Sequence, residues 1–200
     1  MSTPAARARP APLPSDVGTL YRAHVRQVAR WAARLGGPTL DAEDVVHEVF
    51  MIAHQRLATF RGDSAVATWL FGITDRVVRH RRRRARWRRW LSGSADESAG
   101  HLPATGPDPL RAAERSETAR AVYRVLDRLP ERDRQALILF ELEELSADEV
   151  GGLLDIKPGN ARLRLHRARA RFMRLYEKLE TSAAPPRERS DDHVSQRRHA

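Results

Sequence analysis

Residues 146–171 read SADEVGGLLDIKPGNARLRLHRARAR, and this stretch decides which fold the sequence predicts. Ser146 followed three residues later by Glu149 is a capping box, which predicts the start of a short helix. Pro158 suits the first turn of a second helix, because proline lacks the N–H that a first turn leaves unpaired. Two short helices across a turn of about three residues form the plan of a helix-turn-helix.

The second of these helices separates into two faces at about 100° per residue. The inward face is predicted to hold Ala161, Leu165, Ala168 and Phe172. The outer face is predicted to hold Arg162, Leu163, His166 and Arg167. Such a face can enter a DNA major groove, where an arginine can donate two hydrogen bonds to O6 and N7 of one guanine. A plain solvated helix is the competing interpretation, but it gives the outward Leu163 no role.

The rest of the chain continues this helical pattern, with strand-like alternation nearly absent. We expect an all-α fold with two small helical domains joined by a flexible linker, the second being the helix-turn-helix domain. The first domain is expected to contain helices over about 16–35, 41–60 and 65–90. The expected divisions are a disordered arm (1–15), the first domain (16–90), the linker (91–114), the second domain (115–180) and a disordered tail (181–200).

The composition narrows the partners and the chemistry. A net charge of +10 favours a polyanionic partner, because neutralising phosphates releases counterions. The absence of cysteine removes disulfides, thiolate zinc sites and cysteine nucleophiles together. His54 lies seven residues after His47, so the His-Glu-x-x-His zinc pattern fails. We therefore expect no enzyme, no cofactor and no metal. Without an apolar run or signal segment, we expect no membrane insertion and a cytoplasmic location.

Several motifs in both domains resemble bacterial sigma factors of the extracytoplasmic-function (ECF) type. In the second domain the resemblance rests on LPERDR (129–134), LSADEV (145–150) and RLHRAR (164–169). In the first it rests on DAEDVVHEVF (41–50), FRGD (60–63) and TWLFGI (68–73). The resemblance implies a protein that binds core RNA polymerase, brings it to promoters with −35 and −10 elements, and helps to open the DNA.

The resemblance also implies roles for individual residues. Those expected on the −35 element are Arg162, Leu163, Arg164, His166 and Arg167. Those expected on the −10 element and its backbone are Trp69, Arg76, Arg79, Arg81, Arg82 and Arg83. Those expected on the clamp helices of the polymerase's largest subunit are Asp41, Asp44, Val45, His47, Glu48 and Met51. The polymerase flap and an anti-sigma factor are the further implied partners.

Three positions depart from the family's usual residues, and each implies an altered contact. His47 stands where many members have glutamine, Arg76 where many have asparagine, and Leu163 where many have serine or threonine. In the arginine-rich run from Arg79 to Arg89 we favour phosphate contact over a merely solvated helix end. Within it we expect the tryptophans at 87 and 90 to be packing anchors rather than stacking platforms.

Two other functions stay open at this point. A helix-turn-helix regulator that is not a polymerase subunit would not need the 41–50 segment, so capture of core polymerase would separate the two. An interaction protein held by a partner, with DNA binding secondary, is the alternative from a different class, and a co-purification search would test it.

Overall fold

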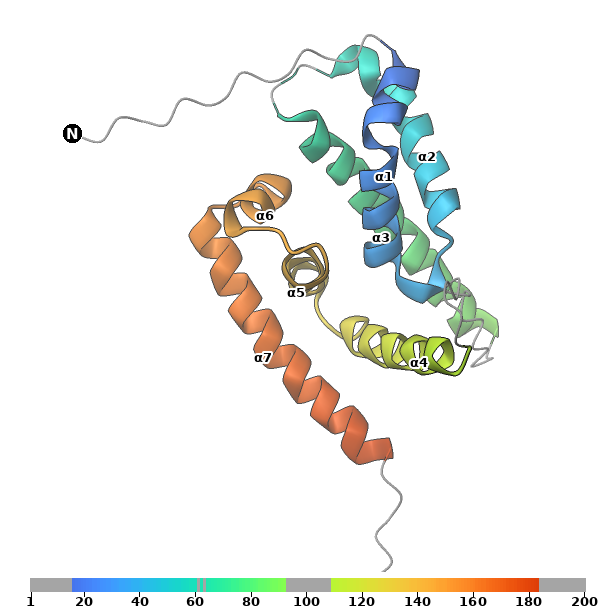
Figure 1. Ribbon diagram of the computed structural model, residues 1–200, viewed down its shortest axis with the longest axis vertical. Coiled ribbons are helices and arrows are strands. Elements are labelled where there is room, and N and C mark those ends of the chain that lie inside the picture. Colours follow the sequence, from blue (N-terminus) through green and yellow to red (C-terminus); the bar gives the residue numbers. More distant parts are fainter. Residues whose placement is uncertain (1–15, 61, 63, 93–108, 184–200) are drawn as a thin grey trace, which may run out of the picture.

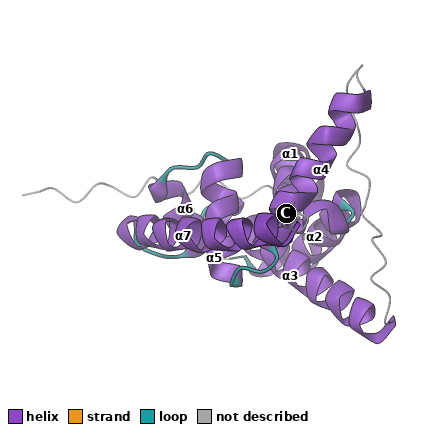
Figure 2. Ribbon diagram, turned by 90° about the horizontal axis from the view of Figure 1, so that it is seen from below, coloured by secondary structure: helices purple, strands orange, loops and turns teal. Residues whose placement is uncertain are grey.

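The computed structural model describes residues 16–60, 62, 64–92 and 109–183, and every regular element in these ranges is helical. Figure 2 shows this arrangement of helices without a strand in the described part of the chain. The all-α fold class is therefore confirmed. The expected arm (1–15), the greater part of the expected linker and most of the expected tail lie outside the described residues.

Three long helices build the N-terminal half of the molecule. They are α1 (Val17–Gly36), α2 (Ala42–Arg56) and α3 (Val66–Ser92), with the short 3-10 turns η1 (Gly37–Thr39) and η2 (Leu57–Thr59) between them. All three fall close to the ranges expected from the apolar periodicity. The second ends earlier than expected, because its last turn tightens into η2.

Acidic caps fix where the first two helices begin. The Asp16 carboxylate accepts a hydrogen bond from the backbone N–H of Thr19 at 2.9 Å. The Asp41 carboxylate accepts from the N–H groups of Glu43 and Asp44 at 2.8 and 3.2 Å. Such caps satisfy N–H groups that a first turn leaves unpaired. They therefore set the register of the α1 and α2 faces that pack inward.

The core of the N-terminal half lies where the inward faces of α1, α2 and α3 meet. Trp31 of α1 is almost fully buried and packs edge-on against Phe71 of α3, with ring centroids 5.2 Å apart. Edge-to-face packing suits the charge distribution of aromatic rings. Aliphatic side chains fill the space around this pair: Leu20, Val28, Leu35, Val45, Val49, Leu70 and Val78.

The C-terminal half consists of shorter helices and one long final helix. They are α4 (Pro109–Leu126), α5 (Glu131–Leu137), the π-helical turn η3 (Ile138–Leu142), α6 (Ala147–Leu154) and α7 (Pro158–Ala183). The helix α4 begins at Pro109, inside the range of 91–114 expected for the linker. The helix α7 likewise runs past the expected boundary at residue 180.

The two halves pack against each other. Figure 1 shows α1, α2 and α3 side by side, with α5 and α6 facing this bundle and α7 on the far side of them. Buried apolar residues of both halves belong to one continuous cluster, which includes Val28 and Val77 on one side and Leu126 and Ile138 on the other. The molecule therefore presents one connected body to its partners.

Candidate nucleic-acid and protein interfaces

The helix-turn-helix forms as its sequence predicts. Ser146 accepts from the N–H of Glu149 through its hydroxyl at 3.3 Å, and its own N–H donates to the Glu149 carboxylate at 2.8 Å. The Ser146 hydroxyl also donates to the Glu149 carboxylate, at 2.7 Å, and this bond together with the one from the Ser146 N–H lowers the pKa of Glu149. Asp155 then adopts a left-handed conformation and ends α6, so that α7 can begin at Pro158. The turn holds α7 in a fixed direction relative to α6.

Gly151 makes the close turn between these helices possible. A Cβ atom placed at this position would lie 2.7 Å from the carbonyl oxygen of Ile156. The backbone N–H of Ile156 also donates to the carbonyl of Gly151 at 2.9 Å. Because the two segments approach so closely, a side chain at 151 would push α7 away from its place.

The outer face of α7 is free to meet a partner. Ala161 and Ala168 are buried, whereas Arg162, His166 and Arg167 are exposed and have no ion-pair partner among the described residues. The side chain of Leu163, which is 47% exposed, lies on the same open surface. Arg164 is only half-buried at the edge of this face. The arrangement leaves a basic surface with one apolar contact, as reading a major groove requires.

The residues expected to dock on the polymerase follow one edge of α2. Asp44, His47 and Met51 are exposed on successive turns, and Glu48 is partly exposed beside them. Asp41 is exposed but uses its carboxylate to cap the helix. Val45 differs from our expectation: its side chain is 0% exposed and packs in the core, so it has no surface to offer a partner.

A groove of about 770 Å³ runs beside this edge, between α1 and α2. Tyr21 of α1 lies in its wall, and its ring packs edge-on against Phe50 at 4.8 Å between centroids. His47 and Met51 line the same groove. Tyr21 was not predicted as a site residue, because helical periodicity alone does not tell which aromatic residue lies at the border between two helices.

Arg81 links two surfaces that we expected to act separately. Its Nε lies 2.7 Å from the Glu48 carboxylate, and its Nη1 lies 3.3 Å from the Asp44 carboxylate. A third contact runs from Nη2 to the backbone carbonyl of Asp44 at 3.3 Å. An arginine expected on DNA thus holds two acids expected on the polymerase.

The other arginines of α3 divide between two sides of the helix. Arg76, Arg79 and Arg83 are exposed on the outer side, where Arg79 also pairs with Asp75 at 2.8 Å. Arg82 points the other way and is only 5% exposed. It therefore does not lie on the open surface where we expected it, because its guanidinium pairs with acids of the C-terminal half.

Aromatic residues mark both ends of this outer side. Trp69, near the start of α3, is half-buried and packs against Phe60 with ring centroids 4.7 Å apart. Near the other end, Trp87 and Trp90 are 61% and 76% exposed and contact each other edge-on. Our expectation that they are packing anchors was wrong, because this end of α3 projects beyond the neighbouring helices (Figure 2).

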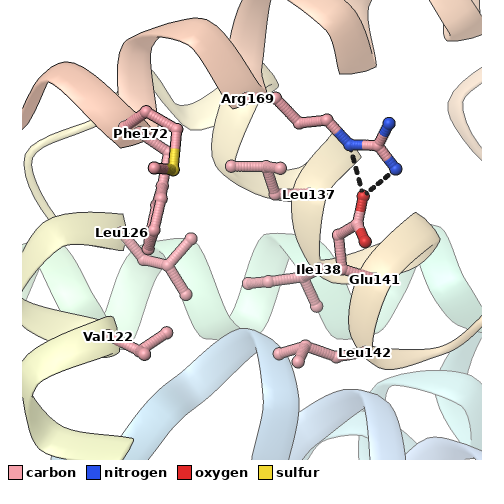
Figure 3. A pocket seen from close by; sticks show the side chains of 9 residues that line it. Val122, Leu126, Leu137, Ile138, Glu141, Leu142, Arg169 and Phe172 are labelled. Atoms are coloured by element: carbon pink, nitrogen blue, oxygen red, sulfur yellow. Dashed lines mark hydrogen bonds and ion pairs between the residues drawn. The ribbon is translucent and has the colours of Figure 1, made fainter. Parts of the chain in front are cut away.

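The C-terminal half carries an apolar pocket of about 370 Å³ between α4, the α5–η3 segment and α7. Figure 3 shows Leu126, Ile138 and Phe172 turned toward one another, with the ion pair of Arg169 and Glu141 at the rim. In that pair, Nη2 of Arg169 lies 2.6 Å from Oε1 of Glu141. The sequence does not predict this pocket, because its walls come from separate helical segments that only the tertiary structure brings together.

In the described ranges, no group of three histidine, cysteine, aspartate or glutamate side chains could hold a metal ion. None of the described helices is both long enough and apolar enough to cross a bilayer.

Comparison with known proteins gives consistent matches to both halves. Residues 20–88 match the family model for sigma-70 region 2, and residues 119–172 match the model for sigma-70 region 4. The chain is 33% identical to the ECF RNA polymerase sigma factor SigM of Mycobacterium tuberculosis, over 81% of this chain and 78% of that protein. It is 37% identical to the ECF RNA polymerase sigma-E factor of Escherichia coli, over 66% of this chain and 72% of that protein.

Solved structures agree at the level of the fold. One is the sigma factor RpoE of Bartonella quintana with the anti-sigma factor NepR, which matches with a TM-score of 0.54 at 23% identity over 80% of this chain and 96% of that one. Another is CnrH with the cytosolic domain of CnrY, which matches with a TM-score of 0.53 at 24% identity over 84% and 89% of the two chains.

Proposed function

This chain belongs to the ECF family of RNA polymerase sigma factors, and we propose which residues of each half contact the polymerase and the promoter. As an ECF sigma factor it binds core RNA polymerase, directs the enzyme to specific promoters and helps to open the DNA. In our proposal it acts in the cytoplasm and catalyses no reaction itself. The polymerase catalyses the reaction, and this chain selects the promoter.

The C-terminal half reads the −35 element in this proposal. The observation that carries it is the exposed basic face of α7, which has no ion-pair partner among the described residues and is held in place by the capped helix α6. Arg162, His166 and Arg167 reach base edges and phosphates, and Leu163 contacts the methyl group of a thymine. The serine or threonine that is usual at position 163 would donate or accept a hydrogen bond there, so leucine changes the preferred base.

The N-terminal half holds the polymerase and the −10 element. Asp44, His47 and Met51 lie on one exposed edge of α2, which supports their docking on the clamp helices. The outer side of α3, with Arg76, Arg79 and other exposed arginines, lies on the −10 DNA and its phosphates. The apolar pocket on the C-terminal half is the surface that we assign to the polymerase flap.

The outer side of α3 continues toward the exposed tryptophans. Arg76, Arg83, Trp87 and Trp90 fall within about 60° of one another around the helix axis. From Arg79 to Trp90 the helix rises about 17 Å at about 1.5 Å per residue, which equals about five base pairs at about 3.4 Å each. This length supports contact between the end of α3 and duplex DNA next to the −10 element.

An anti-sigma factor is a further proposed partner. The RpoE structure that resembles this fold holds the anti-sigma factor NepR, and the CnrH structure holds the cytosolic domain of CnrY. A tagged chain expressed in its native cell should then co-purify with one protein in about equal amounts. Recovery of the chain with core polymerase alone under every growth condition would count against this partner.

Run-off transcription tests the function itself. Purified chain is added to core polymerase with fragments of the genome from which it comes, and we expect transcripts with defined start points. A chain with Arg162→Ala and Arg167→Ala serves as the matched control, because it keeps the fold but loses the α7 contacts. Absence of defined transcripts from every fragment would sink the proposal.

A further inference from the structure

Three large apolar side chains gather on the last described turns of α3. Trp87, Trp90 and Leu91 are 61%, 76% and 70% exposed. The other large apolar side chains that are exposed in the described part of the chain are scattered over α1, α2 and α7. A cluster of exposed apolar side chains marks an interaction surface, whereas scattered ones are normal on any protein.

The three side chains share one sector of the helix, which we call the apolar sector. At about 100° per residue, Trp90 and Leu91 fall about 60° and about 40° to either side of Trp87. The rings of Trp87 and Trp90 contact each other edge-on, with centroids 6.0 Å apart. Figure 2 shows this end of α3 projecting from the neighbouring helices. The apolar sector therefore lies outside the core, where a broad, flat partner can reach it.

Positive charge lies next to the apolar sector. Arg83 and Arg84 lie one turn before Trp87 on the same side of the helix, and Arg86 lies about 100° away from it. All three arginines are exposed and have no ion-pair partner among the described residues. No acidic residue occurs from residue 76 to residue 92. The end of α3 therefore combines an apolar surface with positive charge that no acid on the same helix end balances.

The two classes of polyanion that fit the arginines differ in what they offer the apolar sector. The duplex contact proposed above explains the arginines, because a DNA backbone presents phosphates. It does not explain the apolar sector, because that backbone presents no apolar region for three large side chains. An anionic lipid surface presents both, since headgroup phosphates lie next to acyl chains and tryptophan favours the boundary between them.

The length of the projecting end also fits a lipid surface. At about 1.5 Å per residue, Trp87 and Leu91 lie about 6 and about 12 Å beyond Arg83 along the helix axis. Helices that bind at a membrane interface bury their apolar side chains about 5–10 Å into the boundary between headgroups and acyl chains. With Arg83 at the level of the phosphates, the apolar sector therefore reaches this boundary.

We propose that the end of α3 docks on a lipid surface with anionic headgroups. Trp87, Trp90 and Leu91 enter the interface, and Arg83 and Arg84 bind headgroup phosphates. The inference goes beyond the proposed function and does not rest on it. Because Arg83 is also assigned to promoter DNA, it cannot bind a headgroup and a DNA phosphate at the same time. Lipid binding and promoter contact at the end of α3 therefore exclude each other.

Vesicle flotation with the full chain tests the lipid partner. Vesicles of phosphatidylcholine alone are compared with mixed vesicles, in which about half of the lipid is phosphatidylglycerol. We expect roughly tenfold tighter binding to the mixed vesicles, and weaker binding as the salt concentration rises, because arginines are attracted to an anionic surface. Equal affinity for the two kinds of vesicle, or no binding to either, would overturn the inference.

Fluorescence quenching by brominated acyl chains tests whether the tryptophans enter the lipid. Trp31 is buried in the core and Trp69 is half-buried against Phe60, so quenching reports mainly on the tryptophans at the end of α3. We expect brominated mixed vesicles to quench the parent chain. The variant Trp87→Phe with Trp90→Phe should still bind these vesicles but show little quenching. Binding of the parent without quenching would mean adsorption by charge alone, which contradicts the proposal.

Serine variants test the apolar sector itself. Trp87→Ser together with Trp90→Ser should weaken binding to the mixed vesicles at least roughly tenfold, because affinity for an interface follows the apolar area that is buried. Leu163→Ser together with Met173→Ser is the matched control, since it removes two exposed apolar side chains from α7 and should bind vesicles as the parent does. Parent-like binding by the tryptophan variant would refute the role of the sector.

A second pair of variants tests the charges. Arg83→Gln together with Arg84→Gln should weaken binding to the mixed vesicles roughly tenfold. Arg26→Gln together with Arg174→Gln removes the same net charge from exposed positions on α1 and α7, and less than a roughly twofold change is expected. Equal losses in the two variants would mean that net charge alone attracts the chain, and the end of α3 would then have no special part.

Promoter DNA provides the remaining outcome. The serine variant at 87 and 90 is compared with the parent for binding of the polymerase complex to promoter duplex. If this variant loses affinity for the duplex but binds mixed vesicles as the parent does, the apolar sector contacts nucleic acid and the lipid proposal is wrong. The vesicle assays contain neither polymerase nor promoter, so failure of the run-off assay would defeat the proposed function alone.

Discussion

The two helices that we assign to DNA, α3 and α7, both carry many arginines but use them differently. On α7 the exposed arginines at 162 and 167 have no internal partner within the described residues. On α3, Arg81 pairs with two acids of α2, and Arg82 is buried against the C-terminal half. The difference follows from the position of each arginine: Arg81 and Arg82 lie on the sides of α3 that face α2 and the C-terminal half, whereas the two arginines of α7 lie on its open side. An arginine run therefore indicates a DNA surface only on the turns that the fold leaves free.

The largest effect is expected on stability, in the core of the N-terminal half where α1 packs against α3. Trp31→Ala removes the ring that packs against Phe71, and it should lower the free energy of unfolding by roughly 3–5 kcal/mol. Urea denaturation followed by circular dichroism measures this. Trp87→Ala is the control, because this tryptophan is mostly exposed and its loss should change stability by no more than about 0.5 kcal/mol. Equal losses in the two variants would contradict the assigned core.

The next effect concerns the open side of α7. Arg162→Ala should reduce discrimination at one −35 position by roughly 1–3 kcal/mol, because a forked contact to one base is lost. Binding to a set of promoters with single changes in the −35 element measures it. Arg174→Ala, an exposed arginine farther along the same helix, should leave the preference intact. An unchanged base preference for Arg162→Ala would refute the groove assignment.

A third change tests the acids that hold Arg81. Asp44→Arg should weaken binding to core polymerase roughly tenfold, about 1.4 kcal/mol, since it reverses a charge on the docking edge and repels Arg81. Fluorescence anisotropy with labelled chain and core polymerase gives the affinity. Glu177→Arg reverses an exposed charge near the end of α7 and is expected to bind as the parent does. Normal polymerase affinity in Asp44→Arg would remove α2 from the docking surface.

The fourth effect is smaller and lies in the cap that positions α7. Ser146→Ala removes the hydroxyl of the capping box and should lower stability by about 1 kcal/mol. Thermal unfolding detects a change of this size. Ser146→Thr retains a hydroxyl and should recover most of the loss. If threonine and alanine destabilise equally, packing rather than the cap would explain the effect.

The smallest effect belongs to the exposed side of α3. Arg83→Ala should weaken binding of the polymerase complex to all promoters alike and reduce the salt slope of binding by about 1, as loss of a phosphate contact does. Titrations at several salt concentrations measure the slope. Arg26→Ala, an exposed arginine on α1, should leave the slope unchanged. A change confined to one promoter would mean that Arg83 reads a base instead.

The sequence predicts local features well and contacts between helices poorly. The capping box at Ser146, the turn before Pro158 and the inward alanines of α7 depend on neighbours within one or two turns, and the structure confirms them. The burial of Arg82 depends on Asp127, which comes from the other half, so no periodicity in α3 reveals it. The expected packing role of Trp87 and Trp90 was wrong for the opposite reason, because in the described part of the chain both side chains stay mostly exposed.

Gly37 meets two requirements, one during folding of the N-terminal half and one when the two halves come into contact. Its φ of +68° ends α1, which the N-terminal half needs in order to fold. A Cβ atom at this position would lie 2.6 Å from the Tyr123 ring, a clash that occurs only once the halves meet. Alanine at 37 is therefore penalised first as a misfit in folding and again as an obstacle to docking. Because glycine has no side chain, the N-terminal half can fold first and still leave space at position 37 for Tyr123 of the C-terminal half, which is synthesised later.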